Sequence, residues 1–509
     1  MRTAVLLVMA LAINSTIAHK ILCLNPAPSR SHATLGRGIV NTLLEAGHQV
    51  TWVTAFPDKS INKNLRQIDL PKSREIIKGN EVTSQGHMSM SMLREFARKV
   101  SIAALETSEL RNVLINEKFD AVVTEWFFSD LEAGYAAVQQ IPWILLSGVV
   151  MHPYMEYLVD SVRTLPVTPF MINDFPVPMN FWDRLSNTFS FGMFMFGIWQ
   201  DSEADYDKQF SSIAKARGVS LPPLSISRHN ISIVLVNSHT SFAPAQPLPP
   251  NVIEIAGYHI EETTPLLPKD LQDLLDSSRN GVVYFSMGSV LKSAALPEST
   301  KRELLRVLGS LPYTVLWKFE EQLEGLPKNV HIRSWMPQAS ILVHPNVKVF
   351  ITHGGLLSTL EALRYGVPLL AIPVFGDQPG NAIRAMRSGY ARKVTFSPDM
   401  APELERELKH MLADDTYYNR AKELSKLFNS RPVTQRKLIL HYIELAIETK
   451  GAYHLRSKSQ LYKWYELWML DQLAVVVTVL LFIYILLKKI VSVFTKKNVK
   501  EVKKSKKNK

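Results

Sequence analysis

Near the N-terminus the sequence shows a strand pattern, then a helix pattern, then a second strand pattern, and this order limits the possible folds. Two strands joined by a helix over about 35 residues run parallel in one sheet. The sequence therefore predicts an α/β fold. In this first half we expect a strand at Lys20–Asn25, a helix from about Thr34 to Ala46, and strands at Gln49–Thr54, Phe119–Thr124 and Trp143–Ser147.

The second half of the chain repeats this alternation. Strands are expected at Gly281–Ser286, Thr314–Phe319, Val347–Thr352 and Pro368–Pro373, and helices at Pro297–Leu308, Ser358–Tyr365 and Thr434–Lys450. Between the halves, residues 244–250 contain four prolines, which form a stiff linker. We expect two doubly wound, Rossmann-like domains that face each other, with ligands at the carboxyl ends of their strands.

A nearly unbroken apolar run at Leu470–Leu487 is long enough to cross a bilayer. Trp464 and Trp468 precede the run and Lys488 closes it, as at the two interfaces of a membrane helix. A soluble core helix needs neither flank. The sequence predicts one transmembrane helix at 470–487.

Residues 488–509 form a basic tail with ten lysines and one glutamate, so +9 of the formal net charge of +12 lies there. The remainder is near neutral, which argues against a nucleic-acid-binding face and against a nucleic-acid partner. Basic residues beside a span favour its cytoplasmic side. Lys506 and Lys507 resemble the dilysine signal of endoplasmic reticulum membrane proteins.

The first 18 residues predict a secretory signal peptide, with Arg2 before an apolar run and small residues up to Ala18. A buried first strand is the alternative. Together with the C-terminal span, this signal predicts a single-pass type I protein of the endoplasmic reticulum membrane, with lumenal domains and a cytoplasmic tail. Asn230, in an Asn-Ile-Ser triplet, is then a potential glycosylation site.

A Gly-Gly turn follows the strand that ends at Thr352 and precedes a helix. The free N–H groups of a helix N-terminus and the close backbone approach allowed by glycine suit a diphosphate. His353 and Ser358 add side-chain donors. The stretch from Trp335 to Gln378 resembles the donor-binding signature of the family-one UDP-glycosyltransferases, in particular their animal microsomal branch. The characteristic residues are Phe350, Thr352, His353, Gly355, Ser358, Glu361, Pro368, Pro373, Asp377 and Gln378.

The resemblance implies roles for these side chains. Trp335 would stack on uracil and Gln338 would bond to the uridine. Glu361 would accept the ribose hydroxyls, and Asp377 and Gln378 would bind the sugar. The groups expected around the diphosphate are Ser289, His353, Gly355 and Ser358.

The resemblance also assigns a general base to the loop after the first strand, where His32 stands. Imidazole titrates near neutral pH and suits removal of a proton from an acceptor hydroxyl. A carboxylate should orient it. The family position for this carboxylate is Glu125, and Asp130 is the alternative.

The implied reaction is the inverting, metal-independent transfer of a hexose from a UDP-sugar to a hydroxyl of a small lipophilic acceptor. Detoxification, or conjugation of hormones and xenobiotics, is the expected role. The UDP-sugar is a co-substrate, and no cofactor is expected. Residues 379–381 resemble the invertebrate branch, in which UDP-glucose is the usual donor, and UDP-glucuronate stays an alternative. A catalytically silent binding protein is another alternative, against which the presence of His32 and Glu125 argues. Homo- or hetero-oligomers are left open.

Three further segments complete the expectations. Asp205-Tyr206-Asp207 resembles the metal-holding pair of another glycosyltransferase class, but its surroundings indicate a solvated helix face. Segments His87–Leu93 and Phe189–Trp199 are rich in methionine and aromatic residues, which suits core packing, an acceptor pocket or a membrane-facing surface. The predicted division is a signal peptide at 1–18, an acceptor-binding domain at 19–243, a linker at 244–250, a UDP-sugar-binding domain with a return helix at 251–450, a juxtamembrane segment at 451–469, the span at 470–487 and the tail at 488–509.

Overall fold

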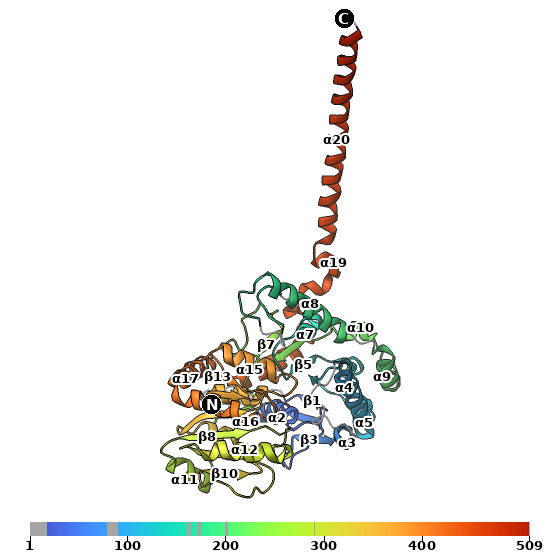
Figure 1. Cartoon of the computed structure of the whole chain (residues 1–509). Coiled ribbons are helices and arrows are strands. Elements are labelled where there is room, and N and C mark those ends of the chain that lie inside the picture. Colours follow the sequence, from blue (N-terminus) through green and yellow to red (C-terminus); the bar gives the residue numbers. More distant parts are fainter. Residues whose placement is uncertain are drawn as a thin grey trace, which may run out of the picture. The chain divides into compact units, whose positions relative to one another are not determined.

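The computed structural model describes residues 18–78, 90–159, 164–170, 175–198, 202–289 and 291–507 (Figure 1). All of the predicted signal peptide except Ala18 lies outside these residues. The chain forms two compact units, Met1–Arg456 and Ser457–Lys509.

The first sheet of the larger unit has seven strands in the order β3-β2-β1-β4-β5-β6-β7, all paired in parallel. From β1 the chain builds one side of the sheet, then returns to β4 and builds the other, as in a doubly wound fold. The strands are β1 (Lys20–Asn25), β2 (Gln49–Thr54), β3 (Leu65–Asp69), β4 (Ala121–Trp126), β5 (Trp143–Ser147), β6 (Ile233–Val236) and β7 (Val252–Glu254).

The second sheet has six parallel strands in the order β10-β9-β8-β11-β12-β13. This order repeats the winding of the first sheet, with the switch between β8 and β11. The predicted pair of Rossmann-like α/β folds is therefore confirmed. Its strands are β8 (Val282–Ser286), β9 (Thr314–Lys318), β10 (Val330–Arg333), β11 (Val347–Thr352), β12 (Leu369–Ala371) and β13 (Ala391–Lys393).

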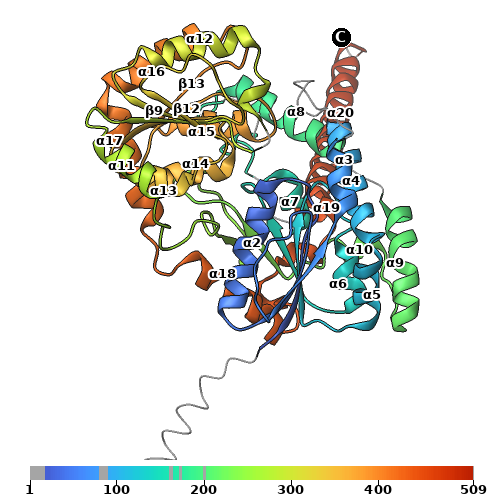
Figure 2. The ribbon, with the colours of Figure 1, turned by 90° about the horizontal axis from the view of Figure 1, so that it is seen from below.

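Both faces of each sheet are covered by apolar clusters, which explains why the strands read as continuous apolar runs. In β1, for example, Leu22 and Leu24 join one cluster, while Ile21 and Cys23 join the cluster on the opposite face. Cys23 is buried and free. Figure 2 shows helices on both faces of the second sheet, with α12 and α16 on one side and α13 and α14 on the other.

Most helices connect consecutive strands. Those of the larger unit are α2 (Arg30–Glu45), α3 (Pro71–Lys78), α4 (Met90–Leu105), α5 (Ser108–Asn116), α6 (Ala133–Gln139), α7 (Pro153–Leu158), α8 (Phe181–Ile198), α9 (Glu203–Arg217), α10 (Leu224–Ser227), α11 (Lys269–Ser277), α12 (Glu298–Gly309), α13 (Gln338–Leu342), α14 (Leu356–Tyr365), α15 (Gln378–Arg387), α16 (Ala401–Ala413), α17 (Asp415–Asn429) and α18 (Gln435–Glu448). Asp205 lies on α9 and forms an ion pair with Arg98, so in the structure it is one partner of a surface pair.

Two elements cross the predicted domain boundaries. Strand β7 follows the proline-rich segment 244–250 but pairs with β6, so it completes the first sheet. Helix α18 comes after the second sheet and packs against α2 and β6 of the first half. The segment 244–250 is thus followed by one more strand of the first sheet before the second begins.

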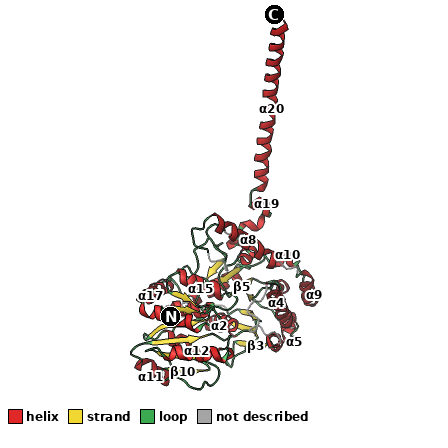
Figure 3. Ribbon diagram, viewed as in Figure 1, coloured by secondary structure: helices red, strands yellow, loops and turns green. Residues whose placement is uncertain are grey.

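The smaller unit contains α19 (Trp464–Leu467) and α20 (Leu470–Lys507) (Figure 3). Within α20, Leu470–Thr495 is long and apolar enough to cross a membrane, and among the described residues no other helix meets this test. The apolar part therefore extends eight residues beyond the predicted end at Leu487, because the sequence after Lys489 turns apolar again.

Candidate active site

His32 and Glu125 meet at the switch point of the first sheet, where β1 and β4 are neighbours. His32 lies in the first turn of α2, directly after the loop that follows β1, and Glu125 is the fifth residue of β4. Their side chains are joined by a hydrogen bond of 2.6 Å between Nδ1 and Oε1. Glu125 is fully buried, whereas 27% of the His32 side chain is exposed. The ring therefore has one nitrogen held and one edge open.

Two further side chains hold the carboxylate of Glu125. The amide of Asn25, at the end of β1, donates to Oε2 at 3.3 Å. The indole Nε1 of Trp52 in turn donates to the Asn25 amide oxygen at 3.1 Å. Gly36 on α2 leaves room for this chain, because a Cβ at that position would overlap the Asn25 side chain. Neither Asn25 nor Trp52 was predicted from the sequence; the position of Asn25 at a strand end was the available signal.

Competing effects set the pKa of His32. Burial lowers it, but the charge of Glu125, the hydrogen bond to Glu125 and the charge of Asp377 together raise the pKa above its usual value. The contribution of Asp377, which lies between β12 and β13 of the second sheet, brings groups from both halves into one electrostatic site. Imidazolium is thereby stabilised at the open edge of the ring.

A second group of candidate site residues begins where β11 ends. The backbone turns through Gly354, with φ +78°, and Gly355 is the N-cap residue of α14. The ring of His353 lies against two glycines, since a Cβ on Gly288 or Gly355 would come within 2.6 Å or 2.5 Å of it. Burial, together with the charge of Lys318, lowers the pKa of His353 to about 4. His353 is therefore neutral near pH 7 and can donate to an anion without a charge of its own.

Gln338, Ser358 and Glu361 form a connected polar group beside this turn. The amide nitrogen of Gln338 donates to Ser358 Oγ at 2.9 Å and to Glu361 Oε2 at 2.6 Å. Burial raises the pKa of Glu361 to about 7. Nearby in the sequence, Trp335 exposes 66% of its surface, so a planar face is available to a ligand.

Asp377 and Gln378 lie at the start of α15. Asn381 donates to Asp377 Oδ2 at 2.7 Å and to the carbonyl of Gly354 at 2.9 Å, which ties α15 to the glycine turn. The amide oxygen of Gln378 accepts from the backbone N–H of Val374 at 2.8 Å. This contact orients the Gln378 amide, and the amide nitrogen is then the group that can donate a hydrogen bond to a ligand.

Comparisons with known proteins show the family of the chain. The family model described as UDP-glucoronosyl and UDP-glucosyl transferase matches residues 5–505. The chain belongs to this family of UDP-glycosyltransferases. It is 30% identical over 482 residues to UDP-glucosyltransferase 2 of Dactylopius coccus, covering 92% of both chains. It is 28% identical to human UDP-glucuronosyltransferase 2B7, over 76% of this chain and 72% of that protein.

Solved structures share the fold. UGT2 of Phytolacca americana, complexed with UDP-2fluoro-glucose and pterostilbene, superimposes with a TM-score of 0.57 at 18% identity, covering 85% of this chain and all of that one. The calicheamicin glycosyltransferase CalG4 gives the same TM-score at 17% identity. This UDP-glycosyltransferase therefore has the two predicted Rossmann-like halves, an architecture known as GT-B.

Asp130 lies apart from the pair formed by His32 and Glu125. The hydroxyl of Tyr154 donates to its carboxylate, and Arg228 Nη1 is 3.2 Å from Oδ2. Both Asp130 and Arg228 are buried. The alternative that Asp130 orients His32 does not fit these contacts, because the β4 strand presents Glu125 to the histidine, whereas Asp130 follows the strand.

Lys318 is a buried cation beside the glycine turn that the sequence analysis did not identify. Its Nζ donates to the carbonyl of Gly288 at 2.9 Å and to Glu320 Oε1 at 2.8 Å. Ser289 is exposed in the turn that Lys318 holds. In the part of the chain that the structure describes, no group of three His, Cys, Asp or Glu residues is arranged to hold a metal ion.

Proposed function

We propose that this UDP-glycosyltransferase transfers glucose from UDP-glucose to a hydroxyl of a small lipophilic acceptor, with inversion at the anomeric carbon. The observation that carries the proposal is the 2.6 Å contact of His32 Nδ1 with buried Glu125. If Nδ1 carries the proton that bonds to Glu125, Nε2 is an unprotonated base at the open edge of the ring.

The reaction is then a single displacement. The acceptor oxygen forms a bond to the anomeric carbon as its proton passes to His32 Nε2, and the bond from that carbon to the UDP oxygen breaks. Glu125 stabilises the resulting imidazolium. The products are the glycoside and UDP, and the proton on His32 is released to solvent.

The second half would bind the leaving group. Backbone N–H groups at the start of α14 and the neutral ring of His353 suit the diphosphate without a metal ion. Glu361 would accept the ribose hydroxyls, Gln338 would bond to the uridine, and Trp335 would stack on uracil. Ser289 and Ser358 would add hydroxyl donors to the phosphates.

Asp377 favours glucose over glucuronate. Asp377 and Gln378 would bind sugar hydroxyls, and a carboxylate on the sugar would be repelled by the carboxylate of Asp377. Arg384, the nearest cation on α15, is already bonded to Asn381 Oδ1 at 2.6 Å and lies over the ring of Phe242. The relative named UDP-glucosyltransferase 2 supports the same choice.

We further propose that the enzyme is anchored by α20 in the endoplasmic reticulum membrane, with its larger unit in the lumen and its basic tail in the cytoplasm. The apolar length of α20 and the lysines after it support this orientation. Asn230 is exposed, as a lumenal glycosylation site must be. Detoxification or hormone conjugation would be the physiological role.

The test is product analysis with microsomes that contain the full chain. UDP-glucose, UDP-glucuronate and other UDP-sugars are offered with a panel of phenols, flavonoids and steroids, and products are identified by mass spectrometry. We expect glucosides, with the β configuration by NMR. Glucuronides as the main products would contradict the choice of sugar, and α-linked products would contradict inversion.

A further inference from the structure

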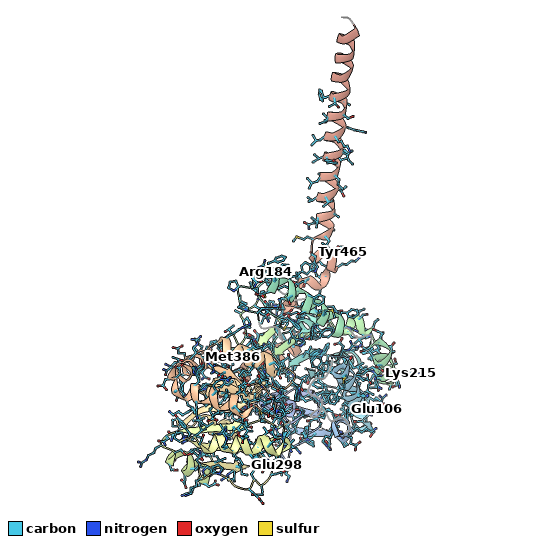
Figure 4. All side chains as sticks on the ribbon, in the orientation of Figure 1. Glu106, Arg184, Lys215, Glu298, Met386 and Tyr465 are labelled. Atoms are coloured by element: carbon cyan, nitrogen blue, oxygen red, sulfur yellow. The ribbon has the colours of Figure 1, made fainter. Side chains whose placement is uncertain are left out.

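Helix α8 carries an exposed apolar stripe that the proposed reaction does not use. Trp182, Leu185, Phe189, Met193 and Phe196 recur at intervals of three and four residues, which places them on one face of the helix. Their exposed fractions run from 52% for Leu185 to 81% for Phe196. Figure 4 labels Arg184 near the N-terminal end of this helix.

The opposite face of α8 is firmly packed, so the stripe is not the result of a loosely held helix. The side chain of Asn187 is buried and donates to the carbonyls of Leu165 and Thr168 at 3.0 Å and 3.1 Å. It also accepts from the backbone N–H of Phe170 at 2.6 Å. Phe194 packs on Phe170, with ring centroids 5.1 Å apart.

We propose that this stripe docks on the surface of a lipid bilayer, at the boundary between headgroups and acyl chains. Large exposed apolar patches mark interaction sites, and helices with Trp, Phe and Leu on one face are typical of this interface. The charged residues of α8, Asp183 and Arg184, are both near its start, so the stripe itself is uncharged.

We infer that a bilayer covers the stripe because the chain carries its own candidate membrane helix, α20. This inference rests on the proposed membrane anchoring by α20. Residues 449–469 join α18 to α20 and reach at most about 75 Å when fully extended. The larger unit is therefore held near the membrane, where an apolar stripe meets lipid at high effective concentration.

A series of aromatic contacts connects the packed side of α8 with the strand that carries Glu125. Phe194 lies 6.4 Å from the ring of His152, which lies 4.5 Å from Trp126, the residue after Glu125. Docking through the stripe would therefore present this half of the enzyme to acceptors dissolved in the bilayer.

The test measures reaction of single cysteines with a charged, membrane-impermeant maleimide, using the full chain in phosphatidylcholine vesicles with its larger unit outside. Cys23 is buried and serves as the unreactive background. Phe189→Cys and Met193→Cys probe the stripe. Thr188→Cys, exposed on another face of α8, is the matched control. Thr478→Cys probes the middle of the span.

We expect Phe189→Cys and Met193→Cys to react about tenfold more slowly than Thr188→Cys, with Thr478→Cys unreactive. Equal rates at 188, 189 and 193 with Thr478→Cys unreactive would overturn the docking of α8 and leave the anchor intact. Rapid reaction of Thr478→Cys would refute the anchor itself. Efficient disulfide cross-linking between two copies through Phe189→Cys would show that a second chain covers the stripe, which also overturns the proposal.

A second, independent observation concerns His259, in the segment that follows β7. Its side chain is buried, and Nε2 lies 3.9 Å from Glu361 Oε1. A backbone hydrogen bond with Leu357 raises the pKa of the ring, but by less than burial lowers it. Burial lowers the pKa of His259 to about 4, so the ring is neutral. The adjacent Tyr258 donates from its hydroxyl to the carbonyl of Leu35 on α2 at 3.1 Å.

We infer that His259 is a positioning residue for Glu361, with its Nε2–H directed at the carboxylate that would hold the ribose. The inference rests on the proposed role of Glu361. The buried ring edge lies beside the carboxylate at 3.9 Å, where a neutral N–H favours a nearby anionic acceptor. Because Tyr258 is bonded to the helix that carries His32, the dipeptide links the donor side to the catalytic side.

The test compares His259→Phe with His259→Gln, which keeps a neutral donor. We expect His259→Phe to raise KM for UDP-glucose about tenfold with kcat nearly unchanged, and His259→Gln to restore most of it. Thermal unfolding verifies that both variants are folded. An unchanged KM in folded His259→Phe would refute the inference. If Glu361→Ala also left KM unchanged, the ribose role of Glu361 would be wrong as well.

Discussion

At the scale of single residues, two buried acids of the first half differ in the groups that they contact. Glu125 contacts a partly exposed imidazole and an amide, whereas Asp130 contacts a buried guanidinium and a phenol. An acid bonded to a group that faces a ligand suits catalysis. An acid enclosed with a buried cation suits stability.

Replacing Glu125 should therefore impair chemistry. Glu125→Gln keeps the shape and removes the charge, and we expect kcat to fall about a thousandfold with UDP affinity unchanged. Since Glu125 raises the pKa of His32, its loss lowers that pKa, and the acid limb of kcat/KM against pH should move to lower pH. Glu109→Gln, at an exposed carboxylate, is the control. A variant with normal kcat would exclude the assigned role.

Replacing Asp130 should instead impair stability. Asp130→Asn leaves the buried Arg228 without its charge partner, which costs about 3–5 kcal/mol. Denaturant unfolding measures this loss, and the kcat of the folded variant should stay near that of the parent. A large fall in kcat at unchanged stability would mean that Asp130 takes part in the reaction.

The raised pKa of Glu361 should make binding of the donor depend on pH. Burial raises its pKa to about 7, so the carboxylate is lost as pH falls through 7 and its capacity to accept two ribose hydroxyls declines. UDP affinity, measured by calorimetry, should fall between about pH 8 and pH 6. His353, with a pKa near 4, stays neutral over this range. Glu361→Gln should bind weakly with a flatter pH dependence; an unchanged slope would assign the titration to another group.

At the scale of elements, the strands were the most predictable part. Buried parallel strands are continuous apolar runs, and the expected strands at 20–25, 49–54 and 347–352 agree with β1, β2 and β11. Helix α2 begins four residues earlier than expected, since its polar first turn Arg-Ser-His carries no apolar period. Strand β7 has three residues, too few for any pattern.

Within the site, the residues that could be predicted were those close together in the sequence. The donor residues from Trp335 to Gln378 lie within one continuous motif, and the structure gathers several of them around the start of α14 and α15. Asn25 and Trp52 escaped prediction because they reach Glu125 only through the pairing of β1 with β2 and β4. Such lateral contacts have no signature along the chain.

The close packing of α2 against β1 gives an element-scale prediction. In an open helix, Gly→Ala stabilises by up to about 1 kcal/mol. Gly36→Ala should instead lower the melting temperature and kcat together, because its Cβ displaces Asn25. Gly192→Ala on α8, where a Cβ meets nothing within 4 Å, is the matched control and should be neutral or stabilising. Normal activity in Gly36→Ala would refute the role given to Asn25.

At the scale of the whole molecule, the enzyme combines two doubly wound halves with one apolar helix. In the proposed reaction each half supplies the site of one substrate, and the charge of Asp377 acts on His32 from the second half. The apolar helix α20 belongs to a separate unit, so anchoring and catalysis should be separable.

The role of His32 as general base is tested by comparing the turnover of His32→Ala with that of the parent enzyme, while calorimetry follows UDP binding on the same preparations. We predict that UDP binds both proteins with similar affinity, while transfer to a phenolic acceptor falls by a factor of about 10²–10⁴ in the variant. Transfer at the parent rate by a folded, UDP-binding His32→Ala enzyme would show that His32 is not the general base.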